Sequence, residues 1–235
     1  MTIYYKAVRP DGTDFFSGTV QWLPKRRSER MRPRVVRHLT STEAVKGRHG
    51  TSLAVSTDVT RLPGSSWPMR LCEVEPVSGA PVVGTDEHKR QAVAWRVVRE
   101  VDPWLRFGPQ GEYVAALIER ARRITPQEGQ ALVSATRTAT RDAAWDAAWD
   151  AAWAAAWDAA WYAAWTATRD AAWDAARTAT RCATWTAARA LVVRDLIGLH
   201  GFTQKHYDVL TRPWRTVIGP IHPDDPELPR AHTGE

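Results

Sequence analysis

The chain has 235 residues, of which 44% are hydrophobic, so it can form a sizeable core in one or two domains. No run of about 18 uncharged apolar residues occurs, and the N-terminus lacks the basic and then apolar layout of a signal peptide, so we expect no membrane association. The net charge is +6, and the two cysteines, Cys72 and Cys182, match no zinc or redox spacing, so we expect reduced thiols, no bound metal or cofactor, and a cytoplasmic protein.

The first 124 residues have the pattern of a small mixed α/β domain. Segments rich in β-branched and aromatic residues predict five strands, and Pro10-Asp11-Gly12 predicts a turn after the first of them. Residues 95–101 are ambiguous between strand and helix, whereas residues 112–123 have the apolar spacing of a helix. The five predicted strands cover residues 3–8, 19–23, 34–39, 52–56 and 70–75.

A long helix is predicted to follow. Thr125 as N-cap, Pro126 as first helical residue and Glu128 at the third position form a capping box. Neither Gly nor Pro occurs between Gly129 and Gly198, and Ala, the strongest helix former, is abundant there. We therefore predict one helix from about Pro126 to about Ile197, roughly 105 Å long at 1.5 Å per residue.

After this helix we predict a short helix at 203–210, a strand or extended arm at 214–218, and a Pro-rich tail from Pro220 that is disordered or loosely docked. The predicted fold class is therefore α+β. It comprises a small N-terminal mixed α/β domain (1–124), one very long Ala/Trp-rich α-helix (125–198), and a short C-terminal segment with a helix and a Pro-rich tail (199–235).

The most regular feature is the tetrad [D/T]-A-[A/T]-[W/R], repeated fourteen times with its fourth position at residues 137 to 189. Because an α-helix has 3.6 residues per turn, each fourth-position residue lies one turn higher and about 40° further round. The tryptophans then form a winding stripe. Helices could pack around one another, π-type bulges could bring the period nearer four, or the stripe could stay partly covered.

The tetrad spacing also predicts contacts between neighbouring fourth positions. Trp145 to Trp165 can form a ladder of aromatic contacts. The predicted cation–π pairs are Arg141–Trp145, Trp165–Arg169, Trp173–Arg177, Arg181–Trp185 and Trp185–Arg189.

An exposed stripe of indoles is unusual for a monomer, so we expect it to be buried against copies of the chain, another protein, or the N-terminal domain. The alternative is that the repeat is a tolerated expansion of a 12-base DNA repeat. The predicted assembly or partner-binding residues are Trp145, Trp149, Trp153, Trp157, Trp161, Trp165, Trp173 and Trp185.

Two parts of the sequence carry a resemblance to known proteins. The first comprises Tyr5-Lys6-Ala7 with Asp11-Gly12, the strand at 52–57, Trp67-Pro68, the segment 70–76, and Lys89 ahead of 96–100. With these residues, roughly the first 105 positions resemble a small domain of unknown function from phage and bacterial proteins. The tetrad array is similar to the Ala/Trp/Arg-repeat tails of uncharacterised proteins of actinobacteria and their tailed phages. The resemblance implies a phage-related protein, located in the cytoplasm of a bacterial host or associated with the virion, and it implies no particular chemistry.

Candidate catalytic groups are few. Glu73 and Glu75 share one face of a predicted strand and, with Glu100, could act as acid and base; a solvated strand face is the simpler interpretation. His38 and His49 could belong to a site, but no set of nucleophile, base and orienting group accompanies them. We therefore name no catalytic residue.

A basic run is the second candidate site. Residues 1–125 hold 21 Lys and Arg against 13 Asp and Glu, whereas residues 126–200 hold 7 against 8. Within 25–37 the basic side chains could contact phosphates without reading bases, although a solvated loop is the simpler interpretation. These side chains are Lys25, Arg26, Arg27, Arg30, Arg32, Arg34 and Arg37.

Three functional hypotheses follow. The first is a non-enzymatic structural or interaction protein that forms homo-oligomers or docks a protein partner through the tryptophan-striped helix. The second is non-specific nucleic-acid binding through the basic run. The third is an enzyme in the N-terminal domain, because short strands with Tyr5, His49 and a late Glu100 are loosely similar to ADP-ribosyltransferase-like folds, an analogy at the level of the fold.

Overall fold

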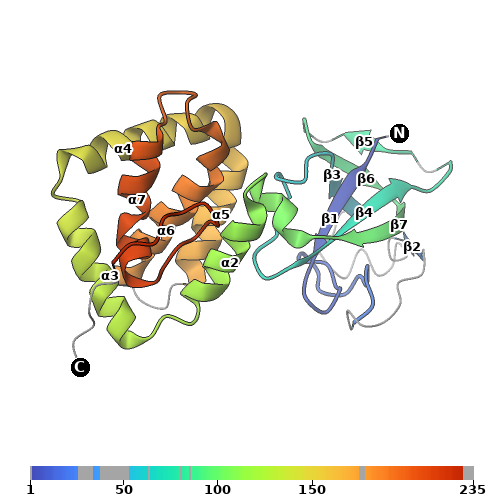
Figure 1. The fold of residues 1–235 in the computed structure, drawn as a ribbon. Helices are drawn as coiled ribbons and strands as arrows, with labels where there is room; N and C mark the ends of the chain where they lie inside the picture. Colours follow the sequence, from blue (N-terminus) through green and yellow to red (C-terminus); the bar gives the residue numbers. More distant parts are fainter. Residues whose placement is uncertain are drawn as a thin grey trace. The chain divides into compact units, whose positions relative to one another are not determined.

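The structure, a computed structural model, describes residues 2–25, 34–37, 53–62, 64–79, 81–84, 86–174 and 178–229. For residues 158, 159, 168, 171–174, 178 and 179 it describes the helical backbone alone. The chain divides into two compact units, Met1–Arg106 and Phe107–Glu235, which we call the sheet unit and the helical unit (Figure 1).

The sheet unit contains an antiparallel sheet. Its strands are β1 (Tyr4–Val8), β2 (Arg34–Arg37), β3 (Leu53–Ser56), β4 (Arg70–Pro76), β5 (Val83–Gly84), β6 (Lys89–Ala92) and β7 (Ala94–Val101). They lie in the order β2-β7-β4-β1-β3-β6-β5. Four of the five predicted strands are confirmed in their described residues as β1 to β4, and the ambiguous segment 95–101 is a strand. The short strands β5 and β6 had no predicted counterpart.

Two aromatic side chains anchor the core of the sheet unit. Trp22 and Trp95 are fully buried among the side chains of Val8, Leu53 and Val97 and their neighbours. The indole N–H of Trp95 donates to the carbonyl oxygen of Leu53 at 2.9 Å, which satisfies its one buried polar group. The alternating apolar residues of the strands therefore face this core as their period of two requires.

The predicted strand at 19–23 is wrong, because the chain there turns back onto the preceding loop. Outside the named strands, Gln21 makes an isolated bridge with Thr13, and the backbone N–H groups of Trp22 and Leu23 donate to the carbonyl oxygen of Gly12. Gly12 has a φ of +83°, and a Cβ there would lie 2.3 Å from the carbonyl oxygen of Leu23. The turn therefore requires glycine, and Trp22 reaches the core from a loop.

The prediction of one very long helix is wrong, because the helical unit contains several helices of ordinary length. Its described residues form α2 (Gly111–Ala121), α3 (Pro126–Ala139), α4 (Ala143–Ala155), a π-helix (Ala156–Ala160), α5 (Trp161–Asp174), α6 (Thr178–Val192) and α7 (Gln204–Val217). The longest of these has 15 residues. Figure 1 shows them folded back on one another as a bundle. Within the described ranges, every helix is too short or too polar to cross a membrane.

Local signals explain where two of these helices begin. The capping box at α3 is confirmed, because Thr125 accepts from the backbone N–H of Glu128 at 3.2 Å and donates its own N–H to the Glu128 carboxylate at 2.9 Å. At the start of α4, the carboxylate of Asp142 accepts from the N–H of Ala144 at 2.9 Å. The first position of a tetrad is therefore also able to cap a helix.

Alanine makes the close packing of the bundle possible. α6 packs against α2, α3, α5 and α7, and α4 packs against α7. Because alanine has a small side chain and the highest helix propensity, these backbones approach closely at no conformational cost. The buried alanines of the tetrad region include Ala148, Ala152, Ala155, Ala163, Ala164, Ala167, Ala183, Ala187 and Ala188.

The C-terminal segment also differs from its prediction. Residues 214–217, predicted as a strand or arm, belong to α7, which carries Pro213 within it. The tail docks onto this helix, because buried Asp225 accepts from the Tyr207 hydroxyl at 2.9 Å and Arg215 donates to the carbonyl oxygen of Pro226 at 2.9 Å. The short helix at 203–210 is thus the first half of a longer one.

The bundle predicts that replacing two neighbouring alanines of α4 by leucine changes stability to very different extents. Ala148 is fully buried, whereas Ala147 is exposed. Replacing Ala148 by Leu overpacks the interior and should lower the free energy of unfolding by about 1–3 kcal/mol, while Ala147→Leu should change it by less than about 0.5 kcal/mol. Chemical denaturation of both variants measures the difference, and equal effects would contradict the packing described here.

Candidate functional site

Tryptophans gather where α4, the π-helix and α5 join. The ring centroids of Trp153 and Trp157 lie 6.4 Å apart, those of Trp157 and Trp161 4.5 Å apart, and those of Trp153 and Trp161 5.7 Å apart. A π-helix holds more residues per turn than an α-helix, so four residues complete less than one turn there. This offsets the 40° advance of the tetrad and lets three successive indoles meet.

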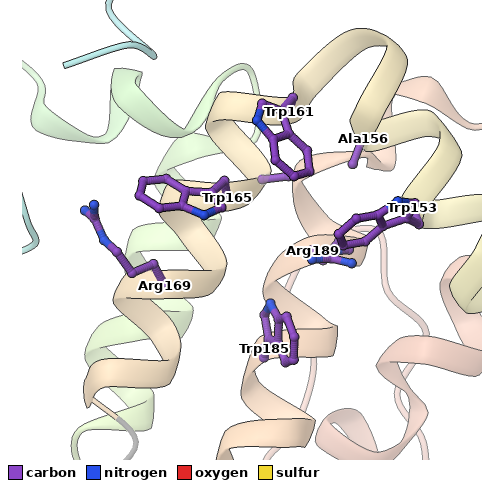
Figure 2. Close-up of a pocket in the computed structure, with 8 residues that line it drawn as sticks. Trp153, Ala156, Trp161, Trp165, Arg169, Trp185 and Arg189 are labelled. Carbon is purple, nitrogen blue, oxygen red and sulfur yellow. The ribbon is translucent and has the colours of Figure 1, made fainter. Parts of the chain in front are cut away.

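A pocket lies beside this cluster, and we call it the tryptophan pocket. It has a volume of about 430 Å³ and is lined by residues of α4, the π-helix, α5 and α6. Figure 2 shows Arg189 on α6 beside the Trp153 ring of α4, with Trp161, Trp165 and Trp185 around the same space. Its lining residues are Trp153, Ala156, Trp161, Ala164, Trp165, Arg169, Trp185 and Arg189.

The lining of the pocket combines small buried side chains with exposed rings. Ala156 and Ala164 are buried, so no bulky group fills the space between the indoles. Trp165 keeps 48% of its surface exposed, and Trp153 and Trp185 are also exposed. A cavity of this size with aromatic walls and a few polar groups is typical of a site for a small ligand.

Arg189 is a buried cation enclosed by indoles. Its guanidinium carbon lies 4.3 Å from the ring centroid of Trp153, 4.7 Å from that of Trp149 and 5.3 Å from that of Trp185. The residue is only 4% exposed, and its Nε and Nη1 have no hydrogen-bond partner among the described residues. Burial lowers the pKa of the guanidinium to about 10, so it stays charged at neutral pH.

The second arginine of the pocket has a different environment. Arg169 stacks on Trp165 at 4.8 Å and donates from Nε and Nη2 to the buried carboxylate of Asp170 at 2.9 and 2.8 Å. Its charge is therefore compensated within the protein. Neither Asp nor Glu occurs among the described lining residues, so the excess positive charge of this lining comes from Arg189.

The structure places the predicted tryptophans in several environments instead of one stripe. Trp145 is buried, and Trp149 packs edge-on against Trp185 with ring centroids 5.6 Å apart. Trp153, Trp157 and Trp161 form the cluster at the π-helix, whereas the side chain of Trp173 lies outside the described residues. The predicted cation–π pairs Trp165–Arg169 and Trp185–Arg189 are confirmed.

Sequence reasoning missed the contacts that bring distant tetrads together. Arg189 contacts Trp149 and Trp153 from another helix, and Ala156 and Ala164 line the pocket between the indoles' helices. The predicted Trp185–Arg189 pair was a signal that Arg189 lies among indoles. The identical tetrads gave no signal for which of them meet across the bundle.

The candidate carboxylates of the sheet unit lie in cross-strand ion pairs. Glu73 on β4 accepts from Arg99 on β7 at 2.6 and 2.8 Å, and Glu100 accepts from Arg70 at 2.9 and 2.7 Å. Glu75 lies 3.3 Å from Arg96 on the facing strand. These pairs account for the acidic residues of β4 and β7 as links between strands.

Glu73 and Glu100 also line a cleft of about 480 Å³ with Arg99, Val101, Asp102 and Leu105. Tyr5 faces Glu73 in the register of β1 and β4. Burial and the Glu73 charge raise the pKa of the Tyr5 hydroxyl, so it stays protonated. Glu73 and Glu100 are thus each held by an arginine, which accounts for these two acids of the cleft as structural ion pairs.

The other candidates are only partly described. Lys25 and Arg37 are exposed and Arg34 is half-buried, whereas Arg26, Arg27, Arg30 and Arg32 lie outside the described residues, as do His38 and His49. Cys72 is buried, which raises the pKa of its thiol to about 12, and Cys182 is exposed. In the described part of the chain, no three His, Cys, Asp or Glu side chains are grouped as metal ligands.

Comparison with known proteins gave no match to a family model, to a curated protein or to a solved structure. The resemblance to phage and actinobacterial repeat proteins therefore stays a prediction.

The ion pairs predict a contrast between two arginines of the sheet unit. The Arg70 and Glu100 side chains are 6% and 17% exposed, so Arg70→Met leaves a carboxylate largely buried without its cation and should lower the free energy of unfolding by about 3 kcal/mol. Arg96→Met breaks a solvated pair and should cost less than about 1 kcal/mol. Denaturant titrations measure both, and an equal cost would contradict a structural role specific to the buried pair.

Proposed function

We propose that this protein is a non-enzymatic interaction protein whose helical unit binds a planar apolar group of a partner molecule in the tryptophan pocket. The observation that carries the proposal is the pocket itself, a cavity of about 430 Å³ with four tryptophans in its lining. Indole faces offer a large, rigid contact area for a flat ring and lose little conformational freedom on binding.

The exposure of the tryptophans supports this function. Trp157 is 60% exposed and Trp165 is 48% exposed, although both lie in a bundle with a well-packed alanine interior. Large apolar side chains that gather at one place on the surface mark sites of interaction in soluble proteins.

The proposal keeps the sequence-based hypothesis of partner docking and changes its geometry. A winding stripe on one long helix would offer an extended contact surface. The bundle instead concentrates Trp153, Trp161, Trp165 and Trp185 around one pocket. The partner then contributes one inserted ring, as hot-spot residues do in protein interfaces.

A neutral probe tests the pocket without assuming a charge on the ligand. We expect 2-naphthol to bind the full chain in isothermal titration calorimetry. Trp165→Ala should weaken binding about tenfold, because one good stacking contact is worth about 1.4 kcal/mol. Trp165 is well exposed, so this change should leave the fold intact, as circular dichroism would show.

Tyr162 provides the matched control. It is an exposed aromatic residue of the same helix, α5, and is 40% exposed, but it does not line the pocket. Tyr162→Ala should bind 2-naphthol as the wild type does. Failure of 2-naphthol to bind, or equal losses in the Trp165 and Tyr162 variants, would refute the proposed site.

A further inference from the structure

The charge at the pocket points to a more specific ligand. Arg189 places a cation in the wall of a cavity that is otherwise aromatic and aliphatic. Burying a charge costs free energy unless an opposite charge or hydrogen bonds compensate it. The faces of the three surrounding indoles stabilise the Arg189 charge in part through cation–π contacts. None of these rings carries a negative charge that could neutralise it.

Two other arginines of the helical unit have their charge neutralised by carboxylates. Arg215, also buried, donates to Asp208 at 2.9 Å and lies 3.8 Å from Asp225. Arg194 lies 3.1 Å from Asp224. The buried Nε atoms of all three arginines lack a hydrogen-bond acceptor among the described residues, but Arg189 alone of the three also has a buried Nη1 that lacks one. The described residues also offer Arg189 no carboxylate of the kind that pairs with Arg194 and Arg215.

Resting on the proposed function, we infer that the tryptophan pocket selects a planar aromatic group that carries an anionic substituent, with Arg189 as its counter-charge. The indoles of Trp153, Trp165 and Trp185 contact the ring system, and the anion lies toward the Arg189 guanidinium. Arg169 contributes less to the selection, because Asp170 already neutralises it at 2.8 Å.

The local environment strengthens the effect of this charge. Exclusion of water by the surrounding indoles lowers the effective dielectric, so an anion gains more from Arg189 than it would from a surface arginine. A guanidinium is also weakly hydrated and planar, which suits it to pair with an anion inside an aromatic enclosure. An aromatic cation would meet uncompensated positive charge in the same space.

A matched series of naphthalene probes tests the inference on the full chain by calorimetry. The series comprises naphthalene-2-carboxylate, 2-naphthyl phosphate, neutral 2-naphthol and cationic 2-naphthylmethylammonium, with acetate as the anion that lacks a ring. We expect at least one of the two aromatic anions to bind ten times more tightly than 2-naphthol. The cation should bind more weakly than 2-naphthol, and acetate should bind too weakly to measure. The carboxylate and phosphate arms show which anion the pocket prefers.

Two arginine variants test whether Arg189 causes the preference for an aromatic anion. Arg189→Met keeps a long apolar side chain and should reduce the preference for the aromatic anion over 2-naphthol from tenfold to less than twofold. Arg181→Met is the control, because Arg181 is an exposed residue of the same helix, α6, and does not line the pocket. It should leave the preference within about twofold of the wild type. A preference lost equally in both variants would overturn the assignment to Arg189.

The wild-type series decides the inference even where Arg189→Met fails to fold. If neither aromatic anion binds more tightly than 2-naphthol, the anion preference is overturned and the proposed function still stands. Absence of binding by all four naphthalene probes would refute the proposed function as well. Acetate that binds as tightly as naphthalene-2-carboxylate would show that the indoles take no part.

Discussion

Four residues of an α-helix turn about 40° more than one full turn, so the indoles of successive tetrads cannot stay on one side of a long straight helix. Such a helix of 14 tetrads would leave most of its tryptophans in water. Division into helices of 13 to 15 residues limits the drift within each segment and lets each present an alanine face to its neighbours. The π-helix at Ala156–Ala160 corrects the phase where the indoles must meet.

The same mismatch explains why a pocket forms among these helices. Alanine faces bring the backbones close together. Trp153, Trp165 and Trp185 stay exposed at the edges of these contacts, because their large rings do not fit between closely packed backbones. Rings from α4, α5 and α6 then surround a space that Ala156 and Ala164 do not fill. Arg189 occupies a fourth position of the tetrad and so lies among these rings, where its charge gives an apolar cavity a preference for one kind of ligand.

Local rules predicted the features that depend on neighbouring residues. The capping box at Thr125 and the Trp165–Arg169 contact follow from spacings of three and four residues, and the strands follow from alternation. The helix breaks could not be predicted, because every tetrad with Asp offers the same cap and only packing selects Asp142. The Trp149–Trp185 contact joins residues that identical tetrads cannot distinguish, so the pocket had no sequence signature.

The distance between Arg189 and Trp149 tests the fold of the tetrad region most directly. In the bundle, the guanidinium carbon lies 4.7 Å from the ring centroid of Trp149. On one continuous helix, the 40 residues between them would span about 60 Å. We predict a nuclear Overhauser effect between the Arg189 side chain and the Trp149 indole, measured at low protein concentration so that contacts between copies are excluded. Absence of this effect, together with scattering typical of a rod, would contradict the bundle and the pocket that depends on it.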